Sequence, residues 1–394
     1  MPSLNIKLAI VTDVLPPWNV GGRETHLELL LPQLADLGFD VTVYTMRWWD
    51  EPVPDEKIGD GWLRVRALAK PRPLYKNGRR SFGQAFAYSI ACLRLLTVDF
   101  DVLQTDPVPY FHLPVVWLVC KIRRRPFAIL WWEVWGKDYW KEYLGLIGYL
   151  GIIFERVTTR MSDATLAGSR RTYQQLADLG VDLDRLVLTE SAPRVLSAKV
   201  MSDSPELLFV GRLLGHKRAD LAIEIVQRLN DPNIRLCVVG SGPVKSELEL
   251  QVRVAKLESQ VIFVERASEE VLAELIVNAK VLVAPSEREG FGLVVAEALS
   301  VGTPVVTVDA STNASKELVI DGVSGRVCRA GDVEDLTSAV RSLLDTPLDR
   351  KSVRVGWASL DIPKDYREVA QRCEPVFVRL ASKVPGRRAR RRLS

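Results

Sequence analysis

The chain has 394 residues, of which 47% are hydrophobic and 26% are charged. This composition excludes an intrinsically disordered chain, and the length predicts one large or two medium globular domains. The five cysteines show no CxxC or Cys/His spacing, so we expect neither a zinc site nor a disulfide framework, and a reducing cytosol is the expected compartment.

The formal net charge of +4 is concentrated at the C-terminal end. The last twelve residues, 383–394, contain six cations and no acid, so the rest of the chain carries a net charge of −2. The body of the protein is therefore not a basic nucleic-acid binder. The tail is expected to be disordered; a solvated tail, a contact to anionic lipid and a contact to nucleic acid are its three alternatives.

The first half of the chain alternates short apolar strands with amphipathic segments of helical length. No basic region with a long apolar core precedes the first strand, so no signal peptide is expected. The strands are predicted at residues 7–13, 40–46, 62–68, 100–105, 126–132 and 163–168. The sequence "DFD" at 99–101 imitates a metal-binding Asp-x-Asp motif, but we interpret it as the start of a strand.

Two glycines follow the first strand. Gly21 and Gly22 precede a predicted helix that starts near Arg23. Glycines let the backbone approach a ligand closely, and a helix N-terminus favours an anion. A plain turn is the alternative, and the dinucleotide fingerprint GxGxxG is absent.

Two apolar runs in this half lack charged residues, at 107–120 and 143–154. Neither reaches the roughly 18 residues needed to span a bilayer. We interpret both as core helices; a surface that touches lipid or a lipid-linked substrate is the alternative.

A Ser-, Pro- and Ala-rich segment at 191–205 is the predicted linker to a second α/β half. The strands of this half are predicted at 206–212, 234–240, 261–264, 280–286, 303–308 and 325–328, and a further helix at 364–383. Continuous apolar strands that alternate with helices indicate parallel sheets covered on both faces. In such sheets, ligands bind at the carboxyl ends of the strands.

Arg212 and Lys217 flank the loop that follows the first strand of the second half. Two cations beside a helix N-terminus are unfavourable unless an anion offsets them, because the helix dipole is already positive there. A diphosphate would fit between them; two solvated surface cations are the alternative. The segment 238–248 repeats the arrangement of strand, glycine-rich loop and helix.

The stretch "EREGFGLVVAE" at 287–297 combines glycines with two acids. Gly290 and Gly292 leave backbone N–H groups accessible, and a helix is predicted from about Leu293. Glu289 and Glu297 can accept hydrogen bonds from sugar or ribose hydroxyls; an acid that complements the helix dipole together with a surface glutamate is the alternative. Together with the two cations, this pattern predicts a site for a sugar nucleotide.

Four segments resemble the group 1 glycosyltransferases, also called glycosyltransferase family 4. They are "GGRETH" at 21–26, "VGRLLGHKRAD" at 210–220, "VVGSGP" at 238–243 and "PSEREGFGLVVAEALSVGTPVV" at 285–306. The resemblance covers almost the whole chain. The segment "WWEVWGKDYWKEYLG" also resembles a Trp-rich subgroup of that family found in archaea and bacteria.

The resemblance implies the α/β fold called GT-B, in which two doubly wound Rossmann-like domains face a cleft. The acceptor-side domain is expected at 1–195 and the nucleotide-sugar domain at 196–363. A C-terminal helix at 364–382 is expected to pack back toward the first domain, followed by the basic tail at 383–394.

The resemblance also implies roles for individual residues. Arg212 and Lys217 would hold the donor diphosphate, Glu289 would bind the transferred sugar, and Glu297 would bind the ribose hydroxyls. Glu289, Arg212 and Lys217 are the expected catalytic residues. The other expected donor-binding positions are glycines and the loop around the first glutamate: Gly21, Gly22, Gly211, Gly290, Phe291, Gly292 and Leu293.

The implied activity is that of a retaining hexosyltransferase that needs no metal and no cofactor. Its donor would be a nucleotide-diphosphate sugar, and its acceptor a glycan, a polysaccharide or a lipid-linked saccharide of the cell envelope. We expect a cytoplasmic protein, peripheral on the inner face of the membrane through an anionic lipid surface, with no nucleic-acid partner.

One position departs from the family pattern. Trp132 stands where family members usually carry a histidine near the donor sugar, and the histidines of this chain, His26, His112 and His216, do not align with it. Glu133 is the nearest polar replacement, and His112 either reaches the cleft from the loop after the strand at 100–105 or has a structural role. The alternative function is therefore a non-catalytic sugar-nucleotide-binding subunit of a glycan assembly complex, and a sugar-nucleotide epimerase is a third alternative.

Overall fold

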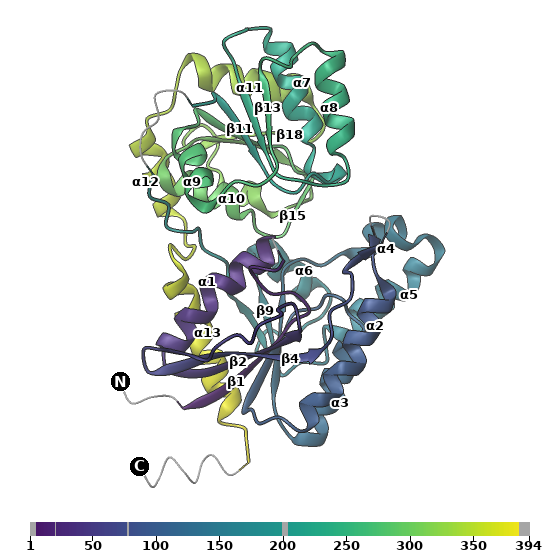
Figure 1. Ribbon diagram of the computed structural model, residues 1–394. Helices are drawn as coiled ribbons and strands as arrows, with labels where there is room; N and C mark the ends of the chain where they lie inside the picture. The colour runs from purple at the N-terminus through teal and green to yellow at the C-terminus, as the bar shows by residue number, and fades with distance from the viewer. Residues whose placement is uncertain (1–4, 20, 77–78, 199–203, 386–394) are drawn as a thin grey trace. The chain divides into compact units, whose positions relative to one another are not determined.

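The computed structural model describes residues 5–19, 21–76, 79–198 and 204–385. The chain divides into two compact α/β units, drawn in Figure 1. The first unit comprises Met1–Ser191 and Tyr366–Ser394, and the second comprises Ala192–Asp365. Of the expected basic tail, residues 386–394 lie outside the described residues.

The first unit is built on an eight-stranded sheet with the order β10-β9-β8-β7-β1-β2-β4-β3. All neighbouring strands are parallel except β3 and β4, which are antiparallel. The strands are β1 (Ile6–Val11), β2 (Phe39–Met46), β3 (Glu56–Ile58), β4 (Gly61–Ala69), β7 (Val102–Thr105), β8 (Phe127–Trp131), β9 (Ala164–Ala167) and β10 (Leu186–Leu188); β5 (Tyr75–Lys76) and β6 (Arg79–Arg80) form a separate pair.

The helices of this unit are α1 (Gly22–Asp36), α2 (Phe82–Ala91), α3 (Leu113–Arg123), α4 (Gly136–Leu144), α5 (Gly148–Thr158), α6 (Arg170–Asp178) and α13 (Tyr366–Ala381). The predicted C-terminal helix is α13, and it contacts α1. The ring of Phe377 on α13 lies 5.9 Å from the ring of Phe39 at the start of β2. Arg372 of α13 also pairs with the carboxylate of Glu190 at 3.2 Å.

The second unit has a six-stranded parallel sheet with the order β13-β12-β11-β14-β16-β18. Its strands are β11 (Leu207–Val210), β12 (Leu236–Val239), β13 (Val261–Val264), β14 (Val281–Ala284), β16 (Val305–Asp309) and β18 (Gly325–Arg329), with β15 (Arg288–Glu289) and β17 (Thr312–Asn313) as a separate pair. Its helices are α7 (Ala219–Leu229), α8 (Lys245–Val254), α9 (Glu269–Asn278), α10 (Leu293–Val301), α11 (Val333–Asp345) and α12 (Arg350–Ser359).

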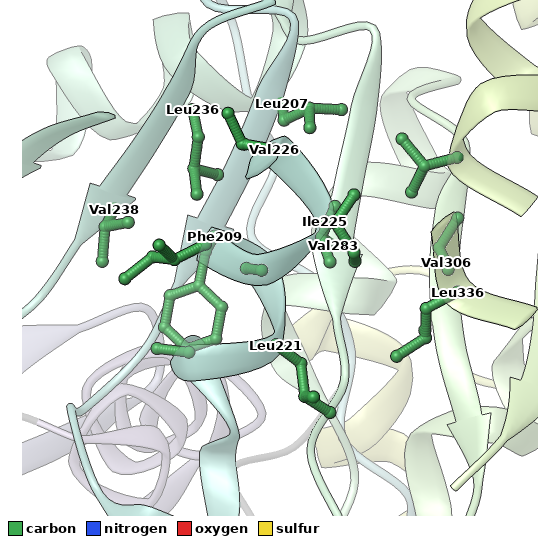
Figure 2. Packing of buried hydrophobic residues seen from close by; sticks show 14 of the residues in the cluster. Leu207, Phe209, Leu221, Ile225, Val226, Leu236, Val238, Val283, Val306 and Leu336 are labelled. Atoms are coloured by element: carbon green, nitrogen blue, oxygen red, sulfur yellow. The ribbon is translucent and has the colours of Figure 1, made fainter. Parts of the chain in front are cut away.

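The strand predictions are confirmed for all twelve apolar runs, because each run supplies a strand of one of the two sheets. Every residue of β7, β8, β9 and β12 is buried. Figure 2 shows one such core, in which Phe209 of β11 and Val238 of β12 lie beside side chains of α7 such as Ile225. The strand after "DFD" begins at Val102, and the carboxylate of Asp99 pairs with Lys7 at 2.5 Å.

The two apolar runs form helices that are buried on one face only. Helix α3 buries Leu113, Val116 and Val119, while Ile122 is exposed. The core-helix interpretation therefore accounts for only part of each run. In the described ranges, no helix combines the length and the apolar content needed to cross a bilayer.

Candidate functional site

In each unit the chain reverses its direction of strand addition beside the first strand. In the second unit this switch point lies between β11 and β14, and in the first unit it lies between β1 and β7. Ligands of doubly wound sheets bind outside the carboxyl ends of the strands at such switch points. The loops that leave these four strands therefore define one candidate site in each unit.

Positive charge gathers at the switch point of the second unit. Burial, together with the neighbouring cations Arg288, Lys217 and Arg212, lowers the pKa of His216 to about 3. All three cations are thus close enough to act on one imidazole. Arg212 and Lys217 were predicted from the sequence, whereas Arg288 was missed, although it lies inside the acidic motif.

The loops after β11 and β14 are bound to each other by polar contacts. Lys217 forms an ion pair with Glu289, and Arg218 donates to Glu287 at 2.5 Å. The backbone N–H of Glu287 also donates to the carbonyl oxygen of His216 at 2.9 Å. The predicted cation and the predicted sugar-binding carboxylate therefore lie together.

The glycine loop leads into α10 through a conformation that requires glycine. Gly292 has φ 96°, and a Cβ at this position would lie 2.4 Å from the Cβ of Ser315. Among the described residues, no side chain caps the start of α10. The side chain of Phe291 is buried in the core and anchors the loop. The first N–H groups of α10, from Leu293, can therefore bind an anion.

Glu297 is buried in α10, with an exposed fraction of 1%. Arg194 donates from Nε to its Oε1 at 2.7 Å, while Oε2 has no hydrogen-bond partner among the described residues. Burial raises the pKa of Glu297, and Arg194 opposes this shift. Sequence reasoning missed Arg194 because it assigned the surrounding segment to a linker.

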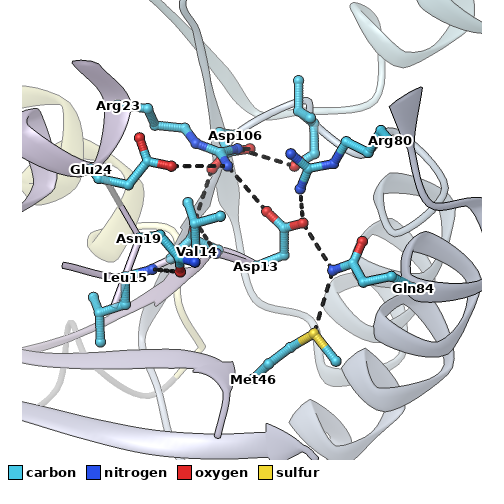
Figure 3. A network of polar contacts seen from close by, with 12 residues as sticks. Asp13, Val14, Leu15, Asn19, Arg23, Glu24, Met46, Arg80, Gln84 and Asp106 are labelled. Carbon is cyan, nitrogen blue, oxygen red and sulfur yellow. Dashed lines mark hydrogen bonds and ion pairs between the residues drawn. The ribbon is translucent and has the colours of Figure 1, made fainter. Parts of the chain in front are cut away.

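The switch point of the first unit holds a network of buried charges, shown in Figure 3. Arg23 donates to Asp106 at 2.9 Å and to Asp13 at 3.2 Å. Arg80 also pairs with Asp13, and Gln84 donates to it at 3.1 Å. This network joins the ends of β1 and β7 to β6 and to the first turn of α2.

The two carboxylates of this network titrate differently. Burial alone would raise the pKa of Asp13, but Arg80 and Arg23 hold it below the usual value. Burial raises the pKa of Asp106 to about 6, and Asp13 adds to this shift. Arg23 and a hydrogen bond from Thr12 oppose the shift. The network therefore contains one firmly ionised carboxylate and one that titrates near neutrality.

The first-unit residues named from the sequence lie around this network. Helix α1 begins at Gly22, and Gly21 precedes it in an extended conformation that other residues can adopt. Trp132 helps line a small cavity with Thr12, Arg23 and Asp106. The Trp132 ring packs edge-on against His26, with 4.4 Å between the centroids.

The polar residues considered as substitutes for the usual histidine have structural contacts. His112 is fully buried and shares a 2.9 Å hydrogen bond with the hydroxyl of Thr105. Glu133 accepts a hydrogen bond from the indole N–H of Trp135 at 2.9 Å. Of Trp132, His112 and Glu133, only Trp132 lines the small cavity.

Both halves of the chain match models of known families. Residues 197–355 match the model described as Glycosyl transferases group 1, and residues 20–189 match that of Glycosyltransferase Family 4. The chain is 34% identical to a glycogen synthase of Mycobacterium tuberculosis, over 95% of this chain and 94% of that protein. It is 29% identical to the GDP-mannose-dependent alpha-(1-6)-phosphatidylinositol monomannoside mannosyltransferase of Mycolicibacterium smegmatis, over 98% and 100%.

Solved structures share the architecture. Anabaena HepE in complex with UDP and glucose matches with a TM-score of 0.71 and 17% identity, over 94% of this chain and 99% of that one. Sucrose-phosphate synthase from Thermosynechococcus elongatus matches with a TM-score of 0.72 and 17% identity, over 96% and 98%. The fold expectation is thereby confirmed, and the chain belongs to the group 1 glycosyltransferases of glycosyltransferase family 4, with the two-domain GT-B fold.

Proposed function

We propose that this protein transfers a hexose from a nucleotide-diphosphate sugar to a saccharide or lipid-linked acceptor, with retention of configuration and without a metal ion. The observation that carries the proposal is the grouping of Lys217, Glu289 and the start of α10 at one switch point. Cation, carboxylate and helix N-terminus suit the phosphates and the hydroxyls of one donor.

The cations would stabilise the diphosphate as it leaves. An ammonium group has three donors, so Lys217 keeps two when Glu289 accepts one. Arg212 and Arg288 add positive charge, and α10 adds backbone N–H groups. Such preorganised donors stabilise the charge that develops in the transition state, which is the task a metal ion performs in other transferases.

The two glutamates would bind different parts of the donor. Glu289 would accept a hydrogen bond from a hydroxyl of the transferred sugar, because this glutamate lies in the loop beside the cations. Glu297 would accept a hydrogen bond from a ribose hydroxyl through Oε2, which has no hydrogen-bond partner among the described residues. Because this oxygen is shielded from solvent, neighbouring side chains must move for the ribose to reach it.

The first unit would bind the acceptor. Its network of Asp13, Arg23 and Asp106 provides charged donors and acceptors at the ends of β1 and β7. The relatives that span the chain include a glycogen synthase and a mannosyltransferase named for a phosphatidylinositol monomannoside. These names support a polysaccharide or a lipid-linked glycan as the acceptor.

Trp132 favours a second candidate, a non-catalytic subunit that binds a sugar nucleotide. Against it, an indole can cover an apolar sugar face and keep one N–H donor. We expect Trp132→Ala to raise the Michaelis constant of the donor or of the acceptor and to lower turnover partially. Trp132→His should retain activity. If the unmutated protein turns over no donor, this result favours the second candidate.

The test is a thermal-shift panel of UDP, GDP, ADP and their common sugars, followed by assays of nucleotide release. A ligand at about 100 times its dissociation constant adds roughly 2.7 kcal/mol of stability. We expect one nucleotide to stabilise the protein and its sugar to be turned over. Stabilisation without turnover, with saccharide and lipid-linked acceptors supplied, would contradict the catalytic proposal; no stabilisation would contradict nucleotide binding.

A further inference from the structure

Three helical segments of the first unit expose an unusual amount of apolar surface. They are residues 82–96, 111–125 and 146–160, which contain α2, α3 and α5. Of the 25 large hydrophobic side chains exposed in the described parts of the chain, 15 belong to these segments. We call these 15 side chains the apolar face. Figure 1 shows α2, α3 and α5 along one side of the unit.

Two of the three segments place most of their exposed side chains along one helical stripe. In the third segment, Leu146, Leu150, Ile153 and Val157 follow the spacing i, i+4, i+7, i+11, with exposed fractions of 87, 67, 59 and 48%. This spacing places Leu150, Ile153 and Val157 on one side of α5, and Leu146 lies in the 3-10 turn Gly145–Ile147 just before that helix. A surface helix of a soluble domain normally directs such a stripe into the core.

The first segment repeats this arrangement. Phe82, Phe86, Ile90 and Leu93 follow the spacing i, i+4, i+8, i+11, and all four are exposed. The opposite side of α2 is buried and includes Ala85 and Tyr88. Helix α2 therefore already has a core-facing side, and its second apolar side remains open.

Ring contacts join the three segments, and the second of these contacts involves the partly buried Phe154. The rings of Phe82 and Phe111 lie 6.2 Å apart, and the rings of Phe111 and Phe154 lie 6.3 Å apart. Helices α2 and α3 are also in contact. Contiguous apolar patches of this kind mark interaction sites, since soluble monomers rarely expose them.

The charges around the apolar face are almost all positive. The three segments contain seven cations and one acid, Glu155. Glu155 is buried, where it accepts hydrogen bonds from Tyr110 at 3.0 Å and from the backbone N–H of Trp135 at 2.8 Å. The exposed charge of these segments is therefore cationic, from residues such as Lys121 and Arg156.

We propose that the apolar face docks on the surface of a bilayer that contains anionic lipids. Its aliphatic and aromatic side chains would enter the boundary between headgroups and acyl chains, and its cations would lie among the phosphates. A basic surface with an apolar stripe has the chemistry of an interfacial helix. A second copy of the chain fits less well, because it would bring exposed cations such as Lys121 and Arg156 against cations of the other copy.

The apolar face is adjacent in the chain to the charged network at the ends of β1 and β7. Phe82 follows Arg80 by two residues, and Phe111 follows Asp106 by five, so the face continues from the charged network at the ends of β1 and β7. This step rests on the proposed function: a lipid-anchored acceptor could extend its saccharide from the bilayer into that network. Docking itself does not depend on it.

The experiment measures partition of the full chain onto phosphatidylcholine vesicles with and without phosphatidylglycerol. Phe86→Glu, Ile122→Glu and Leu150→Glu should each lower partition onto the anionic vesicles about tenfold, because they remove apolar area and add an acid. These side chains are more than half exposed, so the fold should tolerate the changes. Lys121→Gln and Arg156→Gln should each lower partition about fivefold, and less at high salt.

Matched controls come from the second unit. Leu250 and Val254 on α8 are exposed by 54 and 75%, and their changes to Glu should leave partition within about twofold of the unmutated protein. Sedimentation velocity of each variant reports the oligomeric state. The proposal is overturned if the unmutated protein ignores anionic vesicles, if the control variants lose partition equally, or if the face instead holds a dimer that its variants dissociate.

Nucleotide binding in the absence of lipid separates this proposal from the proposed function. We expect Phe86→Glu and Leu150→Glu to bind nucleotide like the unmutated protein, since both lie in the first unit and outside the charged network. Vesicle binding without nucleotide binding would contradict the proposed function and leave the docking proposal standing. Nucleotide binding without vesicle binding would do the reverse.

Discussion

Glu289 and Glu297 have different surroundings, although they belong to one loop and the helix that follows it. Glu289 is partly exposed and paired with Lys217, whereas Glu297 is buried and paired with Arg194. A carboxylate at the edge of a site can bind a group that changes during the reaction. A buried one is suited to a part of the ligand that stays fixed.

This difference predicts separate effects of two isosteric changes. Glu289→Gln should cut turnover at least tenfold with little loss of free-nucleotide affinity, because its partner is on the sugar. Glu297→Gln should weaken free nucleotide and sugar nucleotide alike, by about tenfold, because its partner is the ribose. Calorimetric titration with the nucleotide diphosphate measures both, and the opposite pattern would mean that the two roles are exchanged.

The contact between Arg194 and Glu297 predicts a stability effect. Arg194→Met leaves a buried carboxylate without its cation, so the free energy of unfolding should fall by about 3 kcal/mol. Adding Glu297→Gln removes the buried charge and should restore more than half of that loss. Urea denaturation of both single variants and the double variant measures the coupling; strict additivity would show that the pair is not energetically linked.

The buried histidines predict how stability depends on pH. Burial lowers the pKa of His26 to about 3, while an unfolded histidine titrates near 6.5. Between these values only the unfolded chain binds the proton, so the free energy of unfolding falls as the pH falls from about 6.5 toward 3. The slope from one such group is about 1.4 kcal/mol per pH unit.

His26→Phe should remove that share of the slope. His112, with a pKa of about 4, contributes in the same direction, and Asp106, with a pKa raised to about 6, opposes it between about 3.8 and 6. Both act equally in the variant and the unmutated protein, so the difference in slope isolates His26. Identical slopes from pH 6.5 to 4.5 in chemical denaturation would contradict its buried neutral state.

Single elements are positioned by local rules that the sequence displays. Helix α10 begins where Gly292 can adopt a positive φ, and each parallel strand is a continuous apolar run between polar loops. These signals made the strands, the helix starts and the cluster of Arg212, Lys217 and Glu289 predictable. The short strands β3, β5 and β6 have too few residues to show a period.

Gly292 allows a test at this scale. Gly292→Ala should lower the free energy of unfolding by about 3 kcal/mol, from backbone strain and from the contact with Ser315. Gly322 has φ 76° with nothing near its missing Cβ, so Gly322→Ala should cost only about 1 kcal/mol. Equal losses in thermal denaturation would show that the packing against Ser315 is unimportant.

Pairs of side chains from distant segments were not predictable from one sequence. Arg194 and Glu297 lie 103 positions apart, and Arg80 and Asp13 lie 67 apart. No spacing rule connects such residues, because their meeting depends on how whole strands are ordered. For the same reason, the sequence did not reveal Arg288 and Asp106 as site residues, although Arg288 lies inside the acidic motif at 287–297 and Asp106 directly follows a predicted strand.

At the scale of the whole molecule, each unit has a polar site at its own switch point. The second unit supplies cations, two carboxylates and a helix N-terminus, which suit a sugar nucleotide. The first unit supplies a charged network beside an apolar face, which suits an acceptor held at a bilayer. The proposed use of a sugar-nucleotide donor depends most on the site of the second unit.

The most direct measurement is therefore diphosphate affinity and transfer rate in Arg212→Ala and Lys217→Ala, with Arg228→Ala on α7 as an exposed control. A charge-assisted contact contributes about 1.5 to 3 kcal/mol, so each site variant should lose tenfold to a hundredfold in nucleotide affinity and in turnover. The control should match the unmutated protein. Unchanged affinity and turnover in both site variants would contradict the assignment of this switch point to the donor diphosphate.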